Sequence, residues 1–98
     1  MTTDELMRMI EDNDKLKELS RAFREIDPSK TGMITSPEMD DIFRFLYPDD
    51  MKDKHIYDII KPFEVIANKI LIEYRKFRLW LVEELKNRKK AFDETESL

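Results

Sequence analysis

The chain has 98 residues, enough for one hydrophobic core; 41% of them are hydrophobic and another 41% are charged. Its formal net charge of -4 argues against nucleic acid as the main partner, and the lack of cysteine excludes disulfides and thiolate chemistry. No uncharged apolar run approaches the roughly 20 residues of a membrane span, and acidic residues interrupt the N-terminus too often for a signal peptide, so we expect a cytoplasmic protein without a membrane span.

The first part of the chain has a helical pattern. With one glycine, four prolines and many helix-forming residues, the composition favours helices over strands. A short helix is expected within residues 1–14. From Leu16 to Ile26, apolar residues repeat at three- and four-residue spacing, which predicts an amphipathic helix. Pro28 ends this helix near Asp27, because the residue before a proline is pushed out of the α region.

Residues 27–38 carry oxygen-bearing side chains at a regular spacing. Those side chains belong to Asp27, Ser29, Thr31, Thr35 and Glu38. Gly32, the only glycine of the chain, stands at the sixth position, where a loop that wraps around a cation must reverse sharply. This is the spacing of an EF-hand calcium loop, with ligands at positions one, three, five, seven, nine and twelve. After the loop, Pro37 suits the first turn of a new helix with an apolar stripe at Met39, Ile42, Phe43 and Leu46.

The loop and its flanking helices, residues 19–27 and 38–43, resemble the EF-hand calcium-binding family, which includes calmodulin, troponin C and the myosin light chains. The resemblance covers about residues 15–85. It implies side-chain ligands at five positions, with Thr35 bound directly or through water and Glu38 bidentate, and a backbone carbonyl ligand at Met33. The implied metal ligands are Asp27, Ser29, Thr31, Met33, Thr35 and Glu38.

This site is expected to bind calcium weakly. Only Asp27 and Glu38 carry a negative charge, and Lys30 adds a positive one, so the implied affinity is about 10 µM or poorer. The same residues have a second interpretation. Thr35 and Glu38 also fit a capping box at the start of the next helix, and the rest of the loop fits an ordinary turn. A Glu38→Gln substitution is expected to abolish any calcium response.

The second half of the chain resembles a degenerate partner hand. A linker at residues 47–50 precedes a third expected helix around Ile56–Ile60, whose end Pro62 disturbs. A fourth helix is expected from near Glu73 to about Ala91. The loop between them lacks oxygen ligands in either register that the helices allow, so it is predicted to hold no metal. Its β-branched residues, in two runs around Val65 and Ile70, are expected to pair with Ile34.

The sequence therefore predicts an all-α fold, an EF-hand pair of four main helices with an extra N-terminal helix and a short antiparallel bridge between the two loops. An N-terminal segment, residues 1–14, precedes the pair at residues 15–92. The first hand covers residues 15–47 and the degenerate second hand residues 50–92. Residues 93–98 are predicted to be a disordered tail.

The sequence shows no recognisable set of catalytic residues. The lone His55 has no nucleophile partner, and the acidic pairs are adjacent in sequence, which suits first-turn or solvent-facing charges. The fourth helix is apolar on more than one side: Leu79 and Trp80 lie off the stripe that contains Phe77 and Leu81. Trp80 either packs under the N-terminal segment or meets another protein.

The resemblance implies a groove that holds an amphipathic helix of another protein. The candidate partner-binding residues, which equally suit the core, are Phe23, Met39, Phe43, Leu46, Phe77, Trp80 and Leu81. The favoured function is a non-enzymatic, largely constitutive light-chain-like subunit of a larger assembly, with the cytoskeleton as a candidate location. The alternative is a calcium sensor whose one weak site regulates partner binding.

Overall fold

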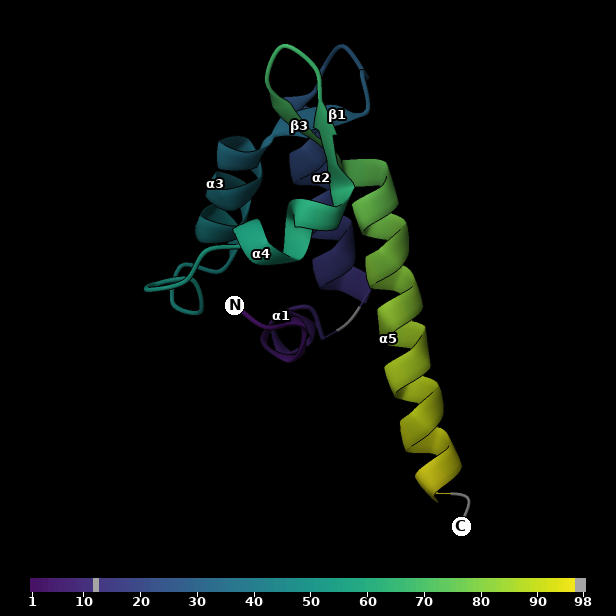
Figure 1. Cartoon of the computed structure of the whole chain (residues 1–98). Coiled ribbons are helices and arrows are strands. Elements are labelled where there is room, and N and C mark those ends of the chain that lie inside the picture. The colour runs from purple at the N-terminus through teal and green to yellow at the C-terminus, as the bar shows by residue number, and fades with distance from the viewer. Residues whose placement is uncertain (12, 97–98) are drawn as a thin grey trace.

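The computed structural model describes the backbone of residues 1–11 and 13–96 and the side chains of residues 1–11 and 14–88 (Figure 1). Its elements follow in the order α1 (Thr3–Met9), α2 (Asn13–Ile26), β1 (Met33–Thr35), α3 (Ser36–Leu46), α4 (Tyr57–Ile60), the 3-10 helix η1 (Lys61–Phe63), β2 (Glu64–Ile66), β3 (Ile70–Glu73) and α5 (Tyr74–Glu96). Among the residues with an assigned position, no helix is both long and apolar enough to cross a membrane.

The strands form an antiparallel sheet of three, in the order β1-β3-β2, so the expected all-α fold is wrong. β2 and β3 make a hairpin in which Val65 lies opposite Leu71, and β1 pairs with the other edge of β3, with Ile34 opposite Ile72. The reason is local, because β-branched side chains cluster on both sides of residues 67–69 and such side chains favour strands. The domain therefore combines helices with a sheet.

The helices also differ from their expected bounds. The third expected helix is a single turn, α4, followed by η1, since Pro62 has no N–H to continue an α-helical hydrogen-bond ladder. α5 begins at Tyr74, as the pattern indicated, but continues to Glu96. The predicted disordered tail at residues 93–98 thus overlaps this helix, and residues 97–98 lie outside the described part of the chain.

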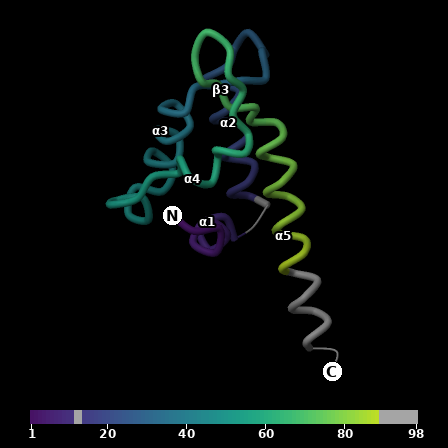
Figure 2. The backbone as a smooth tube through the Cα atoms, in the orientation of Figure 1, coloured from purple at the N-terminus to yellow at the C-terminus, as the bar shows by residue number. Residues whose placement is uncertain are grey.

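The sheet lies at one end of the molecule and the helices extend from it (Figure 1; the tube in Figure 2 traces the same path). α2 ends near the sheet and α5 begins there, so the two helices run antiparallel. They are neighbours, because Phe23 of α2 contacts Tyr74 and Phe77 of α5. α3 lies across from them, α4 and η1 cover the front, and α1 crosses the end of the core away from the sheet, where Leu6 and Ile10 are fully buried.

A network around Asp40 holds the long connection between α3 and α4. Asp40 is buried and accepts hydrogen bonds from Arg44 Nε at 2.8 Å and from the Ile56 N–H at 3.2 Å. Arg44 also donates to the carbonyl oxygens of Met51 and Lys54. Burial raises the pKa of Asp40, but these hydrogen bonds and one from His55 outweigh it and leave the pKa below its ordinary value.

Candidate functional site

The loop that follows α2 reverses direction through two residues with left-handed backbones. Lys30 has φ 56° and Gly32 has φ 82°, and glycine adopts such a φ without a Cβ clash. The chain then enters β1, where pairing with β3 fixes the far side of the loop. The six residues that the resemblance implies as ligands therefore do lie on one loop, between the end of α2 and the first turn of α3.

The carboxylate of Asp27 is fully engaged by donors of the protein. Its Oδ1 accepts hydrogen bonds from the Thr31 N–H at 3.1 Å and from the Thr31 hydroxyl at 2.9 Å. Its Oδ2 accepts from the Gly32 N–H at 2.8 Å and from the Tyr74 hydroxyl at 2.5 Å. Asp27 is only 6% exposed, so these four donors replace water around the carboxylate.

These contacts set the ionisation of both groups. The Tyr74 hydroxyl contributes most to lowering the pKa of Asp27; burial opposes it, and the donors from Gly32 and Thr31 add to it, so that the pKa falls from 3.8 to about 2. Burial and the neighbouring Asp27 carboxylate raise the pKa of Tyr74, while Arg75 opposes them. Near neutral pH the site is a carboxylate held by a neutral phenol.

Glu38, the other charged residue of the implied ligand set, caps α3. Its Oε1 accepts a hydrogen bond from the Thr35 N–H at 2.9 Å, and the Glu38 N–H donates to Thr35 Oγ1 at 3.3 Å. This reciprocal arrangement is a capping box, and the capping-box interpretation of these two residues is confirmed. The same box, made by Thr2 and Glu5, begins α1.

The contacts of the remaining implied ligands do not direct their oxygens toward a common point. Ser29 is exposed. The Thr31 hydroxyl is bonded to Asp27 and accepts from the Met33 N–H at 3.2 Å, and it lies 3.1 Å from the Met33 carbonyl oxygen. Within the described side chains, no group of three or more His, Cys, Asp or Glu residues is suited to hold a metal ion. In this arrangement the oxygens of Asp27, Thr31 and Glu38 are held by contacts within the protein and do not face a common centre.

Arg75 brings a positive charge to the same loop. Its guanidinium lies over Gly32: a Cβ placed on Gly32 would be 3.4 Å from a terminal guanidinium nitrogen of Arg75. A fixed cation beside the loop opposes the binding of another by like-charge repulsion. Sequence reasoning missed both Tyr74 and Arg75 as residues of the site; the only signal was that a buried tyrosine hydroxyl needs a polar partner.

The candidate partner-binding residues form part of the core. Five of them are fully or almost fully buried: Phe23, Met39, Phe43, Phe77 and Leu81. Leu46 and Trp80 are partly buried against the same cluster. The Trp80 ring contacts Phe63, with ring centroids 5.8 Å apart, and Phe77, at 5.9 Å. Trp80 and Leu46 therefore lie at the edge of the core and are partly accessible, whereas the other five are not.

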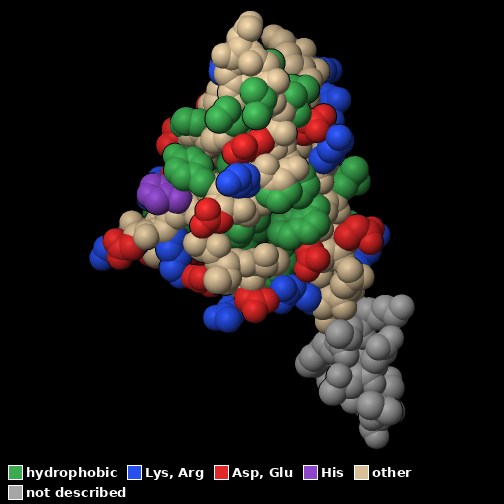
Figure 3. Space-filling model, viewed as in Figure 1, with side chains coloured by type: hydrophobic (Ala, Val, Ile, Leu, Met, Phe, Trp, Pro, Cys, Tyr) green, Lys and Arg blue, Asp and Glu red, His purple; other side chains and the backbone are tan. Residues whose placement is uncertain are grey.

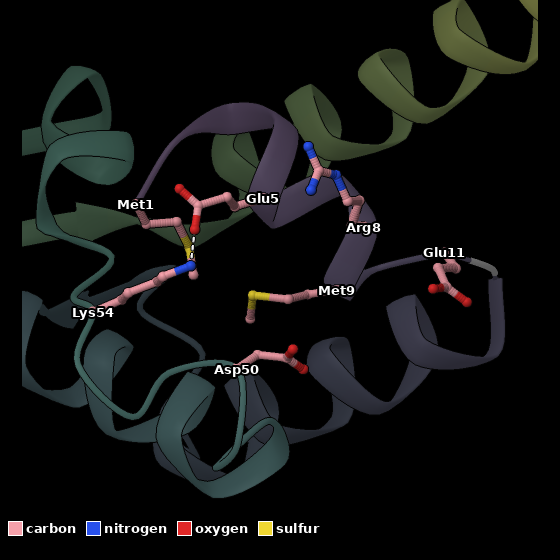
Figure 4. Close-up of a pocket in the computed structure, with 7 residues that line it drawn as sticks. All are labelled: Met1, Glu5, Arg8, Met9, Glu11, Asp50 and Lys54. Carbon is pink, nitrogen blue, oxygen red and sulfur yellow. Dashed lines mark hydrogen bonds and ion pairs between the residues drawn. The ribbon is translucent and has the colours of Figure 1, made fainter.

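A hollow of about 290 Å³ lies between α1 and the connection after α3 (Figure 4). Its lining residues are Met1, Glu5, Arg8, Met9, Glu11, Asp50 and Lys54. Lys54 and Glu5 form an ion pair at one side of the hollow, and Met9 points into it. The lining carries three carboxylates and two cationic side chains, of which Glu5 and Lys54 form this ion pair.

Apolar side chains reach the surface in several places. Figure 3 shows them gathered in front of α4, η1 and the adjoining part of α5, among charged side chains of both signs. The most exposed large apolar residues are Phe45 at 83%, Ile66 at 80% and Leu79 at 62%.

Comparison with known proteins gives no match to a protein-family model, to a curated protein or to a solved structure.

Proposed function

We propose that the protein is a non-enzymatic protein-binding module that works without calcium and stays docked on an amphipathic helix of a larger partner. The loop at residues 27–38 has EF-hand spacing, and in this proposal it serves as a structural turn between two helices. In this proposal the module is light-chain-like, and the β2–β3 hairpin supports the loop through the pairing of β3 with β1.

The observation that supports calcium independence is that protein donors occupy both oxygens of Asp27. A cation bound at Asp27 would compete with the four protein donors of this carboxylate, among them the Tyr74 hydroxyl 2.5 Å from Oδ2, and would approach Arg75. It would also have to take Glu38 from its capping box, which leaves the Thr35 N–H without its acceptor. Each such competition lowers the affinity of a ligand set that contains only two carboxylates.

Partner binding is supported by apolar side chains that the chain leaves unburied. Leu79 lies on α5 off the buried stripe, and Trp80 is only partly covered by Phe63 and Phe77. Tryptophan is enriched at protein interfaces because its ring offers a large contact area and a polar N–H. An amphipathic helix of a partner would cover such a strip with its own apolar positions.

A calcium titration of the whole chain, followed by Trp80 fluorescence and calorimetry, tests this function. The expected result is no saturable signal at micromolar calcium, with partner capture equal in calcium and in chelator. A saturable change near micromolar calcium that Glu38→Gln abolishes would favour the calcium sensor instead. Glu5→Gln, which alters the matching capping box of α1, is the control for a purely structural effect.

A further inference from the structure

Five cationic side chains lie on the outer side of the antiparallel α2–α5 pair. They are Lys17, Arg21, Arg24, Arg75 and Arg78, here called the basic face, and all five are exposed. The three α2 residues are spaced by four and three positions and the two α5 residues by three, so each set follows one side of its helix. The two sides meet, because Arg78 of α5 contacts Ser20 of α2.

Two guanidinium groups converge on that serine. Arg78 Nε donates to Ser20 Oγ at 2.6 Å, and Arg24 Nε donates to the Ser20 carbonyl oxygen at 3.4 Å. Ser20 itself is 9% exposed and donates its hydroxyl to the Leu16 carbonyl oxygen at 3.0 Å. Both arginines are therefore anchored through Nε to neutral oxygens.

No residue of the basic face forms an ion pair among the described side chains, although the exposed Glu18 and Glu25 also lie on α2. Some cations elsewhere on the surface do pair with carboxylates, as Lys76 does with Glu73 and Arg88 with Asp4. Like charges held on neighbouring helix turns repel one another, and an anion that binds between them removes this repulsion.

We propose that the basic face binds an acidic amphipathic helix of a protein partner. The terminal nitrogens of a guanidinium form a planar fork that matches a carboxylate. On α5, Val82 is partly buried and Leu79 is 62% exposed, so apolar contacts flank the cations. A helix with acidic residues on one side and apolar residues on the other complements both features. This inference rests on the proposed function and specifies its partner.

The charge of the whole chain favours a protein segment over a phosphate polymer or a lipid surface. The net charge is -4, so an extended polyanion that covers more than this face meets repulsion from the rest of the molecule. An acidic helix places its carboxylates only where the basic face is. Its binding is expected to weaken with added salt, since exposed charges are screened within about 10 Å at 0.1 M.

The test uses the full chain and a synthetic helical peptide with Glu on one side and Leu on the other, titrated in chelator and in calcium. Saturable binding is expected in both, with amide NMR shifts concentrated in residues 17–24 and 75–82. Arg24→Gln/Arg78→Gln should weaken binding about 5- to 10-fold, from two exposed charge pairs. Lys52→Gln/Lys69→Gln removes two exposed cations elsewhere and should leave binding unchanged. Circular dichroism checks that each variant is folded.

Three results would overturn the inference. The first is peptide binding that Arg24→Gln/Arg78→Gln does not weaken, and the second is no peptide binding at all. The third is that the chain binds another ligand more tightly than the peptide: a single-stranded oligonucleotide, phosphatidylserine vesicles or a second copy of itself. Binding at the basic face that requires calcium would instead overturn the proposed function and leave this inference standing.

Discussion

Asp27 organises its loop in the way that a bound cation otherwise would. Its two oxygens draw in the Thr31 and Gly32 amides from one side and the Tyr74 hydroxyl from the other. Three of the four donors are local, and the fourth ties the loop to the start of α5, 47 residues later. The residue that heads the implied ligand set is thus the residue that closes the loop.

Asp27 is predicted to make stability depend on pH at the acidic end. Its pKa in the folded state is about 2, below the ordinary 3.8, so the stabilisation is complete above about pH 4 and is lost as the pH falls toward 2. Urea unfolding at several pH values should show the gap between the wild type and Asp27→Asn closing over this window. Tyr74→Phe removes the largest cause of the low pKa and should narrow the window; parallel pH curves for the wild type and Asp27→Asn would contradict the prediction.

The start of helix α3 depends on Glu38, which a calcium site would also need. Thr35 lies at the N-cap of α3 and Glu38 three residues later, and each side chain bonds the backbone N–H of the other. Four N–H groups at the start of any helix lack a partner within it, and the capping box satisfies two of them. Metal binding by Glu38 would therefore compete with the stability of α3.

Removing the cap should destabilise the domain by a measurable amount. Thr35→Ala is expected to cost about 1 kcal/mol of unfolding free energy, because the Glu38 N–H loses its acceptor. Thr35→Ser retains the hydroxyl and should stay near the wild type. Urea denaturation followed by Trp80 fluorescence measures both. Equal stability of all three proteins would show that the box contributes nothing in solution.

Across the whole molecule, Phe77 joins the parts of the fold. It is fully buried, and its ring contacts Phe23 of α2, Phe43 of α3, Phe63 of η1 and Trp80 of α5 itself. Helices α2, α3 and α5 and the 3-10 helix η1 thus meet at one aromatic side chain. A small domain has only about 5–15 kcal/mol of stability, so this position has a large share of it.

Phe77→Ala is expected to lower the unfolding free energy by about 3–5 kcal/mol, since it removes a buried ring and leaves a cavity. Phe45→Ala provides the matched control: Phe45 is 83% exposed, and its loss should change stability by at most about 0.5 kcal/mol. Thermal unfolding by circular dichroism compares the two variants. Similar losses for both would contradict the arrangement of the core.

The sequence predicted what depends on local pattern. Period-3.6 apolar spacing located α2, α3 and the start of α5, and the capping spacing located the start of α3. The sheet was underestimated because overall composition argued against strands, while the two short β-branched runs at β2 and β3 decided the local structure. The Tyr74–Asp27 bond and the basic face depend on how α5 packs beside α2, and no local pattern encodes that packing.

The claim that the protein itself closes the loop is tested most directly by NMR of the Gly32 amide while calcium is added to the full chain. The Gly32 N–H donates to Asp27 Oδ2, and the account predicts that its resonance stays unchanged through micromolar calcium, together with those of Thr31 and Thr35. A saturable shift of these three amides at micromolar calcium, lost in Glu38→Gln, would contradict the claim that the protein itself closes this loop.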